Sequence, residues 1–170
     1  FKEVTEKIKS ECDPIIQYST GGAVGTPVEL RSAPLKLKPD MATLSMGTMN
    51  FGEDIFENSS STITHIAGEI KKYNIMPELE IFDLGMLEAI SQYEKSGVLP
   101  QKYHMDFVLG VPGGMNGEVR NLELLVSRIP KEQTWTVAGI GRYQLPLMRY
   151  AIEHGGHVRV GIEDNIYLSK

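Results

Sequence analysis

The middle of the chain contains the stretch that decides the fold: Asp106-Phe107-Val108-Leu109-Gly110-Val111, which leads directly into Pro112-Gly113-Gly114-Met115-Asn116-Gly117. A short apolar run of this kind predicts a buried strand, and the glycine-rich segment after it predicts a turn. Apolar residues then recur at helical spacing between positions 122 and 129. The unit is therefore a strand, a turn and a helix, and it recurs toward both ends of the chain.

Six strands of this type are expected. They are predicted at Pro14–Tyr18, Met41–Ser45, Met76–Phe82, Asp106–Val111, Thr134–Ala138 and Val158–Ile162. Helices are expected between them at 60–73, 84–97, 122–129 and 145–154, with one more before the first strand. Short strands separated by helices are typical of parallel βαβ units.

The spacing of the strands favours a barrel. Their centres lie about 29 residues apart, close to the period of about 31 in a (β/α)8 TIM barrel. A doubly wound open sheet fits the same alternation. However, nearly every strand ends in polar residues or glycine, and in a barrel all these ends meet at one site. We therefore expect an α/β fold, with residues 1–170 forming a single TIM-barrel domain. The domain is expected to be partial, because six strand–helix units cannot close an eight-stranded barrel.

Composition excludes several classes of function. The 170 residues carry a net charge of −5, which argues against binding to nucleic acid or to anionic membranes. No apolar run approaches the ~20 residues that a membrane-spanning helix needs. The single cysteine, Cys12, excludes an internal disulfide and fits a reducing compartment, so we expect a cytoplasmic protein.

The strongest chemical signal follows the last predicted strand. Arg159 precedes the adjacent acids Glu163 and Asp164, and Arg159 and Glu163 would share one face of an extended strand. Adjacent acids point to different sides, so one can bind a metal while the other handles a proton. The alternative is a structural ion pair or a solvated loop.

Hydroxyl groups and glycines follow the first two strands. Ser19-Thr20-Gly21-Gly22 offers hydroxyls and backbone N–H groups suited to a carboxylate or phosphate, although a plain glycine turn fits equally. Thr43 and Ser45 are two residues apart, so they share one strand face and can line a pocket. Their alternative role is that of ordinary strand formers.

Later strand ends add further candidates. Glu80 is charged within a buried strand, which is costly unless the group is paired or functional. Asp83 behind it is either functional or a helix N-cap. Gly141 and Arg142 precede a helix where TIM barrels commonly bind phosphate, which suits a phosphorylated cofactor. The segment Pro112–Gly117 is either a mobile covering loop or a tight turn.

Histidines do not extend this site. All four lie on predicted helices or at the entry ends of strands, so we expect surface or capping roles and no histidine-rich metal site within the chain. They are His65, His104, His154 and His157.

Several longer motifs together resemble the β-keto acid cleavage enzymes, over essentially all of the chain. The motifs are Gln17–Gly25, Ala33–Leu44, Gly47–Gly52, Phe107–Met115, Ala138–Arg142 and Gly155–Asn165. The resemblance implies a zinc-dependent (β/α)8 barrel, of which this chain covers about strands three to eight. It also implies that the first two strands, with a His-x-His pair and an early glutamate, precede Phe1. We expect such a fragment alone to be inactive.

The resemblance also implies a reaction and roles for the residues. The expected enzyme is an acyltransferase that converts a β-keto acid and acetyl-CoA into acetoacetate and a new acyl-CoA. Glu163 would bind Zn2+, and Asp164 and Arg159 would be catalytic. Substrate would contact Ser19, Gly22, Thr43, Ser45 and Glu80, and Gly141 and Arg142 would bind the cofactor. Substrates of the 3-keto-5-aminohexanoate type and a homo-oligomer are expected.

Two other functions compete with this hypothesis. A different metal-dependent TIM-barrel lyase or aldolase would use the same strand ends. A non-catalytic anion-binding module would use the glycine loops and need no metal.

Overall fold

A six-stranded parallel sheet forms the centre of the computed structural model, which describes residues 1–130 and 132–166. The strand order is β1-β2-β5-β6-β7-β8. The strands are β1 (Gln17–Tyr18), β2 (Met41–Ser45), β5 (Met76–Ile81), β6 (His104–Leu109), β7 (Thr134–Gly139) and β8 (His157–Arg159). Neighbours pair in register, for example Ser45 with Glu80 and Glu80 with Asp106. The fold is therefore α/β, with the parallel half-barrel sheet of a partial TIM barrel.

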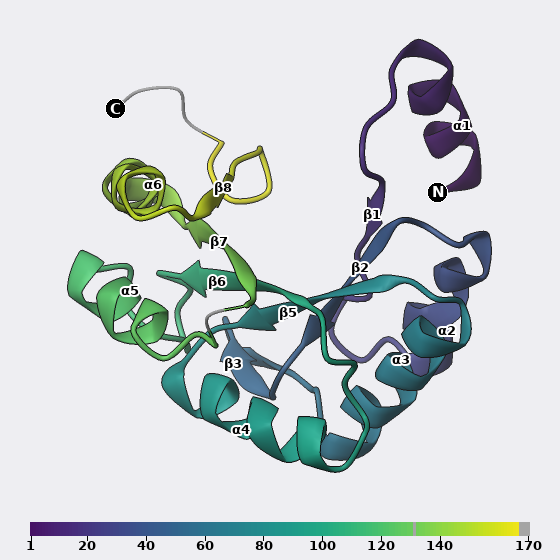
Figure 1. Cartoon of the computed structure of the whole chain (residues 1–170), viewed down its shortest axis with the longest axis horizontal. Coiled ribbons are helices and arrows are strands. Elements are labelled where there is room, and N and C mark those ends of the chain that lie inside the picture. The colour runs from purple at the N-terminus through teal and green to yellow at the C-terminus, as the bar shows by residue number, and fades with distance from the viewer. Residues whose placement is uncertain (131, 167–170) are drawn as a thin grey trace.

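The helices cover the outer face of this sheet (Figure 1). They are α2 (Val28–Ser32), α3 (Ser60–Lys72), α4 (Leu84–Lys95), α5 (Val119–Val126) and α6 (Gln144–Glu153), with short 3-10 helices at Ala33–Leu37 and Gly141–Tyr143. Helix α1 (Lys2–Glu11) stands away from the others beyond β1 and has no buried residue. No described helix is long and apolar enough to cross a membrane.

Helix α3 illustrates how the sequence builds the outer layer. Ser59 caps its first turn, because the Ser59 side chain accepts a hydrogen bond from the Thr62 N–H. Four apolar residues at helical spacing are buried against the sheet: Ile63, Ile66, Ala67 and Ile70. Helix α4 begins in the same way, since Asp83 accepts from the Met86 N–H. Asp83 is thus the N-cap that one of the two interpretations predicted.

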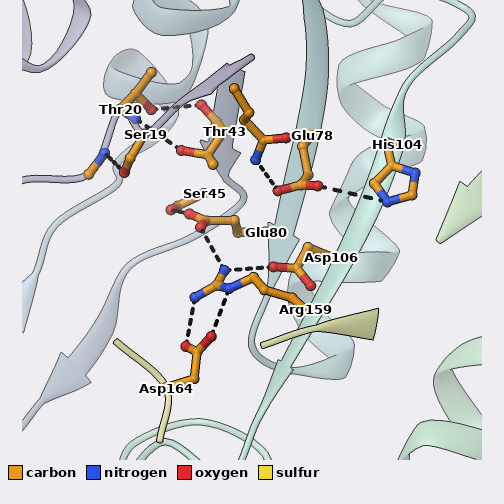
Figure 2. A network of polar contacts seen from close by, with 12 residues as sticks. Ser19, Thr20, Thr43, Ser45, Glu78, Glu80, His104, Asp106, Arg159 and Asp164 are labelled. Carbon is orange, nitrogen blue, oxygen red and sulfur yellow. Dashed lines mark hydrogen bonds and ion pairs between the residues drawn. The ribbon is translucent and has the colours of Figure 1, made fainter. Parts of the chain in front are cut away.

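The two faces of the sheet differ sharply in polarity. Side chains alternate along each strand, so Leu44, Leu79 and Phe107 enter the core beneath the helices. The opposite, inner face is polar. It carries Thr43, Ser45, Glu78, Glu80, His104, Asp106, Thr136 and Arg159. Figure 2 shows these side chains, apart from Thr136, with their polar contacts. The sheet thus has an apolar outer face and a polar inner one.

Several boundaries differ from the prediction. Strand β1 has only two residues, and β6 begins at His104 rather than Asp106. Strand β8 ends at Arg159 rather than Ile162, because the chain then turns: the N–H groups of Asp164 and Asn165 donate to the Gly161 carbonyl. Glu163 consequently lies on a turn and not on the strand face of Arg159.

A hairpin after β2 was not predicted. It consists of β3 (Met49–Phe51) and β4 (Asp54–Phe56), which pair antiparallel. Gly52 allows the turn between them, with a φ of 66° that L-residues with side chains rarely adopt. The hairpin brings Phe51 and Phe56 to the carboxyl ends of the parallel strands, where both line a cavity.

Candidate active site

A cavity of about 410 Å³ lies at the carboxyl ends of the parallel strands. Five of its lining residues also line an adjoining cavity of about 290 Å³: Ser19, Glu80, Arg159, Glu163 and Asp164. All five are residues that the sequence predicted for the site. Thr43 lines the smaller cavity and Gly22 the larger. The structure thus brings together predicted residues from four strand ends.

Arg159 is the centre of the site (Figure 2). Its Nε and Nη2 donate to the two carboxylate oxygens of Asp164, at 3.0 and 2.8 Å. Its Nη1 donates to Asp106 Oδ2 at 2.7 Å and lies 3.6 Å from Glu80 Oε1. One guanidinium therefore holds three carboxyl groups, so the acids at this site outnumber the nearby cation.

Burial changes the protonation of these acids. It raises the pKa of Asp106 to about 8, and the Arg159 guanidinium lowers it only in part. Burial also raises the pKa of Glu80, against the Ser45 hydrogen bond and the Arg159 charge. Burial disfavours the charge of Arg159 itself, but its hydrogen bonds to Asp164 and the nearby carboxylates raise its pKa. Hence Arg159 stays charged, while Asp106 and Glu80 beside it have raised pKa values.

The Ser19–Gly22 loop is attached to β2 by two hydrogen bonds. The Thr20 N–H donates to Thr43 Oγ1 at 3.0 Å, and the Thr20 hydroxyl donates to the Thr43 carbonyl at 2.7 Å. Because Thr20 makes these contacts, Ser19 and Gly22 are turned toward the cavity. The Ser19 hydroxyl oxygen accepts from the Gly21 N–H at 3.1 Å and keeps its own hydrogen free to donate.

Arg31 fixes the same loop from behind. This buried side chain donates to the carbonyls of Thr20 and Glu57 at 2.8 and 3.0 Å and to Asn58 Oδ1 at 2.6 Å. It therefore joins the Ser19–Gly22 loop to the segment behind the hairpin. The sequence analysis did not identify Arg31, since a single arginine on a short helix gives no signal of these contacts.

Ser45 and Glu80 form a pair across neighbouring strands. The Ser45 hydroxyl donates to Glu80 Oε2 at 2.6 Å, as their register on β2 and β5 allows. Glu80 Oε1 lies 3.6 Å from Arg159 Nη1. Of the two residues, only Glu80 lines the cavities. Ser45 therefore acts on the cavity indirectly, by orienting the Glu80 carboxylate.

Glu163 differs from the other acids of the site. It is exposed, lines both cavities and makes no hydrogen bond or ion pair within the described residues. An unpaired carboxylate at a cavity fits one ligand position of a metal ion. The described residues contain no group of three or more metal-ligating side chains. Among the described residues Glu163 therefore fits one ligand position, and these residues by themselves form no complete metal site.

Gly141 and Arg142 lie at the same end of the sheet but outside the cavity lining. The Gly141 N–H donates to the Asp164 carbonyl at 3.1 Å. Arg142 is exposed, and its Nη2 donates to the hydroxyl of the adjacent Tyr143 at 2.7 Å. In this arrangement the Arg142 guanidinium is exposed beside Tyr143, whereas the Gly141 N–H is engaged.

The segment Pro112–Gly117 is a tight turn. The Gly110 N–H donates to the Met115 carbonyl at 2.9 Å, and the Met115 N–H donates to the Phe82 carbonyl at 2.7 Å. Gly113 has a φ of 98°, and a Cβ placed there would lie 2.1 Å from the Asn50 carbonyl oxygen. The turn therefore fits closely against the hairpin, where Pro112 lines the cavity.

His104 departs from its predicted surface or capping role. It belongs to β6, and its two ring nitrogens lie 2.7 and 2.6 Å from the hydroxyls of Thr134 and Thr136. Glu78 Oε2 lies 3.8 Å away, and Gln17 donates to the other oxygen of Glu78. Burial, and then the nearby His157, lower the pKa of His104 to about 4, so the ring is neutral. This network reaches the smaller cavity only through Gln17, which lines it.

Asp106 is the site-forming residue that sequence reasoning missed. Its signal was present, because a charged residue in the apolar run Asp106–Val111 is as costly to bury as Glu80. Asp106 lies at the start of the predicted strand, whereas the candidate site residues were expected at the carboxyl ends of strands. The strand in fact begins two residues earlier, which places Asp106 inside β6.

Comparison with known proteins identifies the family of the chain. A family model described as beta-keto acid cleavage enzyme matches residues 1–170. A 3-keto-5-aminohexanoate cleavage enzyme of Fusobacterium nucleatum is 46% identical over 100% of this chain and 62% of its own length. One of Acetoanaerobium sticklandii is 45% identical over 100% of this chain and 63% of its own length. A 3-oxoadipate:acetyl-CoA acetyltransferase of Cupriavidus necator is 39% identical, with 100% and 61% covered.

A solved structure supports the fold. The apo structure of ObcA matches 92% of this chain and 42% of its own, with a TM-score of 0.74 and 20% identity. The chain spans 62% and 63% of the two 3-keto-5-aminohexanoate cleavage enzymes that it matches.

Proposed function

Because the chain belongs to the beta-keto acid cleavage enzyme family, we propose that the whole protein exchanges acyl groups between a β-keto acid and acetyl-CoA. In this exchange the C2–C3 bond of the keto acid breaks. C2, with its carboxylate, bonds to the carbonyl carbon of the acetyl group, whose bond to the sulfur of CoA breaks, and acetoacetate results. The acyl group that contains C3 forms a new thioester bond with that sulfur. Two relatives named for 3-keto-5-aminohexanoate support this class of substrate, and one relative named an acetyl-CoA acetyltransferase supports the co-substrate.

The pair Arg159–Asp164 carries this proposal. Asp164 is buried at 8% exposure, lines the cavity and has both oxygens bound by one guanidinium. The ketone of a β-keto acid acidifies the protons on C2. A carboxylate fixed in this way would accept one of them, and Arg159 would hold Asp164 in place while it did so.

The remaining cavity residues would bind the substrate. The Ser19 hydroxyl, the Gly22 backbone and Thr43 would hold the substrate carboxylate, since they come from the loop and strand that Thr20 joins. Glu80, oriented by Ser45, would face the variable end of the substrate. Arg142 would bind the phosphates of the CoA thioester at the rim, and Gly141, whose N–H donates to the Asp164 carbonyl, would hold that segment in place.

We also propose that Glu163 is one ligand of a zinc ion whose histidine ligands come from outside the described residues. Bound zinc would act as a Lewis acid toward the keto oxygen of the substrate. The support within this chain is the unpaired Glu163 carboxylate beside Asp164. The single partial domain over residues 1–170, the homo-oligomeric state and the cytoplasmic location belong to the same proposal.

An exchange assay tests the proposed function. The whole protein is incubated with acetyl-CoA and a panel of β-keto acids with cationic, neutral and acidic side groups, and products are identified by mass spectrometry. We expect acetoacetate and the matching acyl-CoA in equal amounts. Cleavage that needs no acetyl-CoA would indicate a lyase or aldolase instead. Binding of the keto acid without any product would indicate the anion-binding module.

A further inference from the structure

Asp106 is a completely buried acid on the central strand β6. Its relative exposure is 0%, and in the register it lies between Glu80 on β5 and Thr136 on β7. Burying a carboxyl group costs free energy unless it is hydrogen-bonded or paired. A specific partner must therefore offset the free-energy cost of burying Asp106, and the identity of that partner indicates the role of Asp106.

The partner is Arg159. Asp106 Oδ2 accepts a hydrogen bond from Arg159 Nη1 at 2.7 Å, whereas Oδ1 has no hydrogen-bond partner among the described residues. Asp106 is not among the residues that line the two cavities at the strand ends. A residue in this position contacts Arg159 without reaching a substrate in either cavity.

The geometry of the guanidinium connects Asp106 to Asp164. The group is planar and rigid, so fixing one nitrogen restricts the directions of the others. Asp106 holds Nη1, while Nε and Nη2 bind the two oxygens of Asp164. Figure 2 shows Asp106 and Asp164 on different sides of the Arg159 side chain. Without Asp106, Nη1 would lose its hydrogen bond on the inner side and keep only the longer 3.6 Å approach of Glu80 Oε1.

We propose that Asp106 is a positioning residue, which fixes the plane of the Arg159 guanidinium and thereby holds Asp164 in its reactive orientation. The role of Asp164 rests on the proposed function, whereas the contact between Asp106 and Arg159 does not. Asp106 acts here as a hydrogen-bond acceptor, so an asparagine, which keeps one acceptor oxygen, preserves much of the effect.

The kinetic test compares three variants of the whole protein in the acyl-exchange assay. Asp106→Ala should lower kcat by about 10- to 100-fold, as loss of a hydrogen bond to a charged group predicts, with KM within about twofold. Asp106→Asn should recover kcat to within about threefold. Thr136→Val is the matched control, because Thr136 neighbours Asp106 but contacts His104, and it should keep kcat. Full kcat in Asp106→Ala would overturn the proposal.

A second readout needs no activity. The Arg159 Nε–H is part-buried and donates to Asp164, so its exchange with solvent is slow and measurable by 15N NMR, with Arg159→Lys used for assignment. Asp106→Ala should speed this exchange at least about tenfold, and Asp106→Asn should leave it within about threefold. Unchanged exchange in Asp106→Ala contradicts the proposal.

The two readouts separate the possible failures. If Asp106→Ala does not fold, Asp106→Asn decides: a loss of kcat above about tenfold with unchanged Arg159 exchange would assign Asp106 a direct role and overturn positioning. If the wild-type protein shows no acyl exchange with any β-keto acid, the proposed function fails. The exchange of the Arg159 Nε–H still decides whether Asp106 holds Arg159.

Discussion

Arg159 binds both carboxylate oxygens of Asp164, through Nε to Oδ2 at 3.0 Å and through Nη2 to Oδ1 at 2.8 Å. The two residues are separated by the turn that follows β8, in which the Asp164 N–H donates to the Gly161 carbonyl. A bidentate pair of this kind fixes the orientation of the carboxylate as well as its charge. Glu163, the residue before Asp164, is left unpaired among the described residues and lines the cavity.

The difference between these adjacent acids gives the first prediction. Asp164→Asn should keep the metal content of the whole protein and lower kcat by about 100-fold or more, because a proton acceptor is lost. Glu163→Gln should lose zinc and activity together, since a neutral amide is a poorer metal ligand. Metal content after dialysis and acyl-exchange rates measure both effects. Full zinc occupancy and rate in Glu163→Gln would show that Glu163 is not a ligand.

Glu80 gives a prediction about substrate choice. Its carboxylate lines the cavity and is oriented by Ser45, so it should favour β-keto acids with a cationic side group. Burial raises the pKa of Glu80, and a substrate cation would offset that cost. Glu80→Gln should lower kcat/KM for a cationic substrate by about tenfold more than for a neutral one of equal size.

The matched control for this prediction is Glu78→Gln. Glu78 lies on the same strand and contacts Gln17 and His104, but it does not itself line either cavity, so its substitution should not change the preference between the two substrates. The measured quantity is the ratio of kcat/KM values. An equal ratio in Glu80→Gln and wild type would refute the role of Glu80 in selectivity.

Asp106 gives a prediction about pH. Its folded pKa of about 8 lies above that of an unfolded aspartate, so the folded state holds an extra proton between about pH 4 and 8. Stability from this group is therefore lost as pH rises toward 8. His104 has the opposite sign, because its pKa is lowered to about 4, but it acts only below about pH 6.5.

The window between about pH 6.5 and 8 therefore isolates the buried acids. The free energy of unfolding should fall there by on the order of 1 kcal/mol through Asp106. Burial also raises the pKa values of Glu78 and Glu80 on the neighbouring strand β5. The positive charge of Arg159 lowers the pKa of all three acids and so opposes these shifts. Urea denaturation at several pH values measures the slope. It should be smaller in Asp106→Asn, and an equal slope in both proteins would contradict the raised pKa.

The sequence predicted the parallel sheet and the helices over it because their signals are local. Strand β2 has the predicted bounds, and α3 lies within the helix predicted at 60–73. The residues at the strand ends also follow from topology alone, since parallel strands bring their carboxyl ends to one edge. This rule predicts that Ser19, Glu80 and Arg159 lie close together, and in the structure all three line the same two cavities.

Features set by tertiary contacts could not be predicted in this way. The hairpin β3–β4 has short strands with exposed Phe51 and Ile55, so no alternation identifies it. Strand β8 was predicted too long because Val160 and Ile162 are good strand formers, although both are exposed in the turn. The link from Asp106 to Arg159 crosses 53 positions of sequence, and no local pattern indicates such a pair.

Arg31 gives the last prediction, because it joins two segments that shape the cavity. Its three donating nitrogens bind the Thr20 carbonyl, the Glu57 carbonyl and Asn58 Oδ1. In Arg31→Met an unbranched, uncharged side chain remains, but these acceptors lose their partner. Leaving such groups unpaired should lower the free energy of unfolding by about 2–4 kcal/mol. The Ser19–Gly22 loop would also loosen, so KM for the β-keto acid should rise while kcat changes less.

Arg120→Met is the control for this substitution. Arg120 is exposed and pairs only locally, with Glu118 at 2.6 Å, so its loss should change stability by less than about 0.5 kcal/mol. Urea denaturation and substrate titration of both variants compare the two arginines directly. A stable Arg31→Met with unchanged KM would mean that the loop keeps its conformation through the Thr20–Thr43 hydrogen bonds alone. A rise in KM confined to Arg31→Met would establish that the buried guanidinium, from outside the cavity, shapes the carboxylate-binding loop.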